Sequence, residues 1–237
     1  MQRRDFIKSI VAAGASVAVG RRAHAVPQGW REFEITYVVT LKDASVPAQL
    51  WVPVPQDALD YQRLVDLGWR SSAPAYVLWE GTSRAPIVSV EWLDLTTPRD
   101  VKITARVMTR DRSGFYPDAS REELAEYLRP TPSSPSDGIV LTKAREIVGA
   151  RTAPLDKARA IYDWVVDNTF RRAETRGCGL GNVAFMLRSG DLGGKCADIN
   201  SLYVALARAA GLPARDVFGI HVLAGQPKVS RLLAVLA

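Results

Sequence analysis

Hydrophobic and polar residues alternate along the part of the chain that follows residue 30. Apolar side chains recur at every second position over residues 33–41, and the same period returns over residues 101–107. This spacing predicts strands that bury one face. Two β-rich runs, residues 49–54 and 87–93, lie between them, and prolines punctuate the turns. We therefore expect a small antiparallel β-sandwich over residues 30–112.

The pattern changes after this region to one that is typical of helices. Ser120 and Glu123 have the spacing of a capping box, which predicts a short helix that ends before Pro130. A stretch rich in proline and serine follows, so residues 113–138 are predicted to be a helix and a linker. Apolar residues at helical spacing then predict helices over residues 139–150 and 155–169.

Glycines interrupt the pattern over residues 176–195, which predicts a loop with at most a turn at residues 184–188. A helix is predicted from 197 to 210, because Gly211 and Pro213 supply the usual stop signals. Residues 217–223 are apolar and β-branched, which favours a strand. The chain is thus expected to be α+β, with the sandwich followed by a mixed core over residues 139–237.

Residues 1–25 have the order of a targeting segment. Arg3 and Arg4 precede a weakly hydrophobic stretch rich in alanine, glycine and valine, which is typical of a twin-arginine export signal. Ala23 and Ala25 form the small-x-small pattern of a signal peptidase site. We expect cleavage after Ala25, a periplasmic or otherwise exported protein, and no membrane span in the mature chain. An ordinary secretory signal or a retained anchor is the alternative.

The positive charge of the chain is concentrated in this leader. The 25 residues hold five basic residues and one acidic residue, so the net charge falls from +6 to about +2 without them. A nucleic-acid-binding surface needs clustered Lys and Arg on the folded part, so no nucleic-acid partner is expected. With two histidines, His24 and His221, a His/Cys metal site is not expected, nor is a cofactor.

Cys196 follows two glycines and a lysine and stands at the start of a predicted helix. Free N–H groups and the helix macrodipole favour a thiolate at that position, and Lys195 adds positive charge. The same N–H groups can hold a developing oxyanion. Cys196 is therefore the candidate nucleophile; the alternative is a small buried cysteine.

Cys178 lies between two glycines and has no helix start after it. We interpret it as a structural residue or one that supports the site. A Cys178–Cys196 disulfide is a third possibility in an exported protein, and it would abolish the nucleophile.

Several motifs around Cys196 occur together and point to a family. They are Arg176-Gly177-Cys178-Gly179, the run from Ser189 to Asp198, the run from Leu202 to Arg215, and Val217-Phe218-Gly219. Over about residues 155–221 these motifs resemble the core of bacterial transglutaminase-like cysteine enzymes. The resemblance implies a papain-like fold and acyl transfer through a thiol acyl-enzyme on amide or peptide bonds of a protein or peptide. Peptidase or amidase activity is expected in preference to cross-linking.

The resemblance also implies a histidine and an aspartate on later strands of the core. His221 is the only histidine after the leader, and it precedes the place where the family carries its base. We interpret His221 as an incidental strand or surface residue. The segment after residue 222 has lost the resemblance, which suggests a truncated or frameshifted C-terminus that lacks the last strands, and an inactive polypeptide.

A non-catalytic binding or scaffold protein of the periplasm is the alternative function. Five aromatic residues of the β-rich part could form a carbohydrate or peptide platform, but packing in the core is the favoured interpretation. They are Trp51, Trp69, Tyr76, Trp79 and Trp92.

Overall fold

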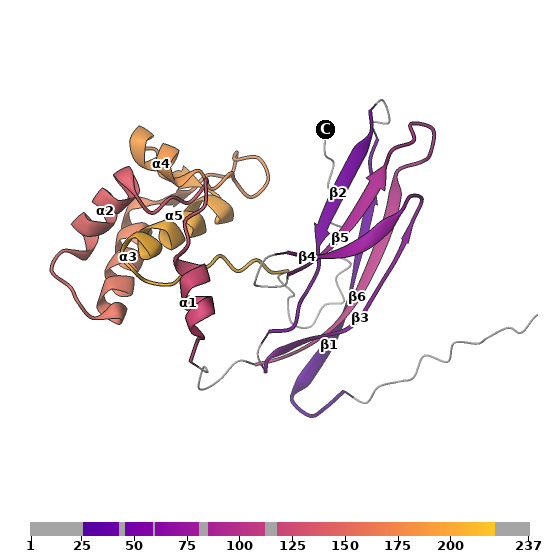
Figure 1. The fold of residues 1–237 in the computed structure, drawn as a ribbon, viewed down its shortest axis with the longest axis horizontal. Coiled ribbons are helices and arrows are strands. Elements are labelled where there is room, and N and C mark those ends of the chain that lie inside the picture. Colours follow the sequence, from indigo (N-terminus) through magenta and orange to yellow (C-terminus); the bar gives the residue numbers. More distant parts are fainter. Residues whose placement is uncertain (1–25, 43–45, 59, 81–84, 112–117, 221–237) are drawn as a thin grey trace, which may run out of the picture.

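The computed structural model describes residues 26–42, 46–58, 60–80, 85–111 and 118–220. Six strands come first in the chain, and helices with one short strand pair follow (Figure 1). The strands are β1 (Trp30–Thr40), β2 (Ala48–Pro53), β3 (Gln62–Ser71), β4 (Ala75–Glu80), β5 (Ala85–Trp92) and β6 (Asp100–Arg110). The predicted strands at 33–41, 49–54, 87–93 and 101–107 are confirmed as β1, β2, β5 and β6.

The six strands form two antiparallel sheets, in the orders β1-β6-β3 and β2-β5-β4. Their inward residues meet in one core, because every second side chain of a strand points to the same face. Trp92 is 1% exposed in that core, and its indole N–H donates to the hydroxyl of Ser72 at 3.0 Å. The buried members are Tyr37, Val39, Leu50, Val52, Val54, Val88, Val90, Trp92, Val101 and Ile103. The expected β-sandwich is confirmed.

The prediction that the aromatic residues pack in the core is wrong for most of them. Trp51 is 54% exposed, Trp79 is 58% exposed and Tyr76 is 41% exposed. Trp51 and Tyr76 are both paired with Ser89, from opposite sides, in the β2-β5-β4 sheet. Both therefore lie on the outer face of that sheet, which is why the core does not contain them.

The second half of the described chain is mainly helical. It consists of α1 (Arg121–Leu128), α2 (Gly138–Val148), α3 (Pro154–Asn168), β7 (Phe170–Arg171), α4 (Val183–Ser189), β8 (Gly193–Gly194) and α5 (Cys196–Ala209). The helices predicted over 139–150, 155–169 and 197–210 are confirmed as α2, α3 and α5. The capping box of α1 is also confirmed, because the Ser120 hydroxyl and the Glu123 carboxylate each accept from the other's backbone N–H. Residues 184–188, predicted as a turn, belong to helix α4.

Helices α2 to α5 share a second core, with α5 at its centre. Leu202, Ala205 and Leu206 of α5 are fully buried against the other three helices. Residues 217–220 form no strand, so the strand predicted over 217–223 is wrong for these four positions, and the last three lie outside the described residues. No helix within the described part of the chain has both the length and the apolar character needed to cross a membrane.

Candidate active site

Cys196 is the first residue of α5, one position earlier than the predicted helix start. Its side chain is exposed, and the following turns of the helix are anchored in the core. The interpretation of Cys196 as a small buried cysteine is therefore wrong. A thiol at this position is open to solvent while its backbone is held by a rigid element, which is what a nucleophile requires.

The N–H groups of the first helical turn are not all used by the protein. The N–H of Ala197 donates to the carbonyl oxygen of Cys178 at 2.9 Å. The N–H of Cys196 itself has no backbone acceptor within the described ranges. It therefore offers a donor beside the sulfur, at the place where an oxyanion would form during attack on a carbonyl.

Asp198 ties the preceding loop to this helix start. Its carboxylate is almost fully buried and accepts three backbone N–H groups, from Lys195 at 3.0 Å and from Leu180 and Gly181 at 2.9 Å each. A buried carboxylate is stable when hydrogen bonds replace its water. Sequence reasoning does not single out Asp198, because two of its partners lie 17 and 18 residues earlier in the chain.

Two glycines leave the room that Asp198 occupies. A Cβ atom on Gly179 would lie 1.9 Å from its Oδ2 atom, and one on Gly194 would lie 2.5 Å from its Cβ atom. Gly179 also has a φ of +99°, a conformation that other residues rarely adopt. Glycine at these two positions thus allows the loop and the helix start to meet around the carboxylate.

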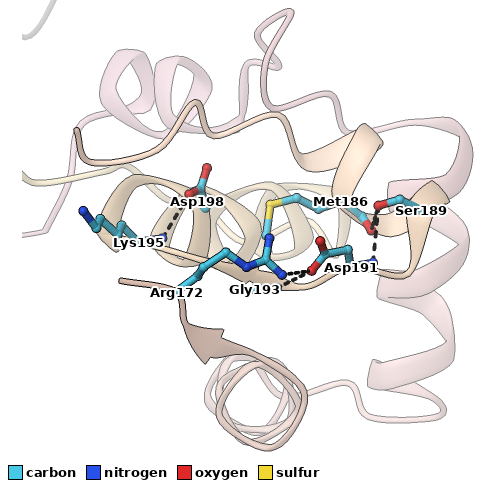
Figure 2. A network of polar contacts seen from close by, with 7 residues as sticks. All are labelled: Arg172, Met186, Ser189, Asp191, Gly193, Lys195 and Asp198. Atoms are coloured by element: carbon cyan, nitrogen blue, oxygen red, sulfur yellow. Dashed lines mark hydrogen bonds and ion pairs between the residues drawn. The ribbon is translucent and has the colours of Figure 1, made fainter. Parts of the chain in front are cut away.

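A short parallel ladder connects the end of α3 to the residues before Cys196. Strand β7 pairs with β8, and the N–H of Arg172 donates to the carbonyl of Gly194 at 2.8 Å. The Arg172 guanidinium also forms an ion pair with Asp191 at 2.6 Å (Figure 2). The hydrogen bond from Arg172, followed by that from the Gly193 N–H, lowers the pKa of Asp191. These contacts fix the path of the chain into α5.

Cys178 and Cys196 lie next to one another, and neither is in a disulfide. The Cys196 sulfur is 3.9 Å from the carbonyl oxygen of Cys178. The pKa of the Cys178 thiol is raised, first by a hydrogen bond with the Cys196 side chain and then by the charge of Cys196. The structure thus places Cys178 beside the candidate nucleophile, as a supporting residue would be.

The two histidines considered in the sequence are outside the part of the chain that the structure describes. His221 and His24 lie outside the described residues, so the described chain contains no histidine. Among the residues that the structure describes, no group of three or more His, Cys, Asp or Glu side chains could hold a metal ion.

The sequence of this chain is similar to a known family and to a protein of known sequence. Residues 142–231 match the transglutaminase-like superfamily. This match is longer than the expected 155–221, and it extends ten residues past His221, into the segment predicted to have lost the resemblance. An uncharacterized protein of Haemophilus influenzae is 35% identical over 241 aligned residues, which cover 93% of this chain. The chain spans 65% of the length of that relative.

A solved structure shares the fold. The crystal structure of a candidate cysteine protease from Cytophaga hutchinsonii aligns with a TM-score of 0.55 and 19% identity. The alignment covers 78% of this chain and 67% of the other. This likeness supports the expected α+β fold, with antiparallel sheets and a papain-like core.

Proposed function

We propose that the chain acts as a cysteine enzyme with Cys196 as its nucleophile, because residues 142–231 match the transglutaminase-like superfamily. The observation that carries the proposal is the exposed thiol at the first position of α5, beside its own N–H group, which has no backbone acceptor among the described residues. The substrate is an amide or peptide bond of a protein or peptide. Hydrolysis, as in a peptidase or amidase, is proposed over cross-linking.

The chemical steps follow from this arrangement. The Cys196 thiolate attacks the carbonyl carbon, the carbonyl oxygen becomes an oxyanion, and the Cys196 N–H donates to that oxyanion. Collapse of the tetrahedral intermediate expels the amine and leaves a thioester on Cys196, which water then hydrolyses. An acid–base group is needed to protonate the leaving amine and to activate water, and the described residues contain no histidine for that role.

The test isolates the first chemical step, which needs only the nucleophile. We expect an activated acyl ester to place one acyl group on Cys196, detected by intact mass and peptide mapping, and we expect Cys196→Ala to accept none. Cys178→Ala is the matched control and should still be acylated, because Cys178 is a neighbouring thiol without a helix start. Acylation of Cys178 instead, or alkylation of Cys196 no faster than that of free glutathione at pH 6, would contradict the proposal.

A non-catalytic binding role is the second candidate, and the outer face of the β2-β5-β4 sheet favours it. Trp51 and Tyr76 are exposed there, on either side of Ser89. Exposed aromatic residues that gather on one face are common at binding sites. If Cys196 proves unreactive in the acylation test, this face becomes the better candidate for the function.

We also propose that the protein is exported through the twin-arginine pathway. The mature protein recovered from the periplasm is expected to begin at Val26, as measured by N-terminal sequencing. Replacing Arg3 and Arg4 with lysines should keep the precursor in the cytoplasm, because the pathway requires the arginine pair. The same change at Arg21 and Arg22 is the control and should leave export intact. A periplasmic protein that retains its first 25 residues would contradict the cleavage site.

A further inference from the structure

The two cysteines of the site form a pair that the acyl-transfer chemistry does not need. Both thiols are exposed, and the Cys196 sulfur lies 3.9 Å from the Cys178 carbonyl oxygen. The N–H of Ala197, the next residue, is bonded to that same oxygen. The backbone of Cys178 is thus held directly against the helix start, and the two cysteine side chains are close enough for a hydrogen bond between them.

The loop that carries Cys178 is held by Asp198 after the cysteine and has open space beside the residue before it. Asp198 holds the N–H groups of Leu180 and Gly181, which follow Cys178. Gly177, which precedes it, has a φ of +61° and no atom within 4 Å of where a Cβ would stand. The contacts of the buried carboxylate thus involve the residues after Cys178, and the open space at Gly177 leaves room for the loop before it to adjust.

We propose that Cys178 and Cys196 are a site of reversible oxidation, in which a peroxide converts the pair to a disulfide and switches the nucleophile off. This inference rests on the proposed function for its consequence, but the disulfide itself can be detected without any substrate. Because cysteine oxidation beyond the sulfenic acid is mostly irreversible, the disulfide would also protect Cys196.

The reaction has two steps and consumes one peroxide. The Cys196 thiolate attacks one peroxide oxygen, the O–O bond breaks, and a sulfenic acid and a hydroxide form; the hydroxide takes up the proton that the Cys196 thiol released and becomes water. The Cys178 thiol then loses its proton and attacks the sulfenic sulfur, the S–S bond forms, and the S–O bond breaks; the leaving hydroxide takes up that proton as a second water. Two thiols are oxidised and the peroxide is reduced. The negative charge of Cys196, which helps to raise the pKa of Cys178, is absent from the sulfenic acid, so Cys178 ionises more easily when it has to attack.

The test treats the full chain, first reduced with dithiothreitol, with dilute hydrogen peroxide. Trypsin should separate the cysteines, because Arg176, Arg188, Lys195 and Arg208 bound one peptide that contains Cys178 and another that contains Cys196. We expect these two peptides to be linked within one molecule, and alkylation of Cys196 to fall at least about tenfold and to return with dithiothreitol.

The matched variant is Cys178→Ser, which keeps the size of the side chain and removes the resolving sulfur. In this variant, peroxide should carry Cys196 to sulfinic or sulfonic acid, and dithiothreitol should not restore alkylation. The proposal would be overturned by the absence of the linked peptide, by links between separate molecules, or by full recovery of the variant. A linked peptide in a protein that no acyl ester modifies would leave the oxidation site standing and reject the proposed enzyme function.

Discussion

Gly179→Ala is expected to destabilise the protein far more than Gly177→Ala, although both glycines have positive φ and flank the same cysteine. At Gly177 an added Cβ meets nothing, so the cost is about 1 kcal/mol from the left-handed conformation. At Gly179 the Cβ would fall 1.9 Å from the Asp198 carboxylate, and the loop must leave the helix start. We expect a loss of more than about 3 kcal/mol, measured by urea unfolding.

The same two variants also distinguish an effect on the reactivity of Cys196 from an effect on the stability of the fold. Gly177→Ala should keep the alkylation rate of Cys196 within about twofold, because the contacts of Asp198 are intact. Gly179→Ala should change that rate even at low temperature and without denaturant, where the helical core is still folded. Equal stability of the two variants would show that the close packing of Gly179 against Asp198 is absent in solution.

Asp198 should be the most sensitive polar residue of the helical part. Asp198→Ala removes the acceptor of three N–H groups, that of Gly181 buried and those of Leu180 and Lys195 partly buried, which we expect to cost about 3 kcal/mol. Asp198→Asn should cost less, because its amide oxygen can still accept from Leu180 and Gly181 while its NH₂ group faces the Lys195 N–H. The measurement is the free energy of unfolding, together with hydrogen exchange of these three amides.

Asp163→Asn supplies the control for this series. Asp163 forms an ion pair with Arg159 one turn earlier in α3, and both side chains are largely exposed. Exposed pairs of this kind contribute little, so a change of less than about 0.5 kcal/mol is expected. If Asp198→Ala were as mild as Asp163→Asn, the buried carboxylate would not be the link between the loop and α5.

The strands and helices that sequence patterns predict are those with a clear period. β3 is not predicted because its register shifts between Leu64 and Asp66, so that one extra residue breaks the alternation. β4 is not predicted because Tyr76 and Leu78 are apolar and yet exposed, which hides the contrast between its two faces. α4 has seven residues, too few to show a helical period.

In the candidate site too, sequence patterns identify residues with a local signal and miss those that depend on distant parts of the chain. Cys196 can be found from sequence, because glycines followed by a helix start are a local signal. The role of Asp198 cannot be found in this way, because it depends on contact with a loop residue that lies 17 positions earlier in the chain. The exposed aromatic residues are assigned wrongly because β-sheet preference does not say which face of a strand meets the core.

The contacts of α1 bear on how the helical part could be produced by itself. The Ala214 N–H donates to the Tyr127 carbonyl at 3.0 Å, and the Arg208 guanidinium donates to the Arg129 carbonyl at 3.0 Å. The segment before α2 therefore forms hydrogen bonds with the C-terminal end of α5 and the residues that follow it, although α1 itself buries no residue. A recombinant fragment intended to study Cys196 should start ahead of Ser120, because one that starts at α2 would leave the far end of the nucleophile's own helix without its partners.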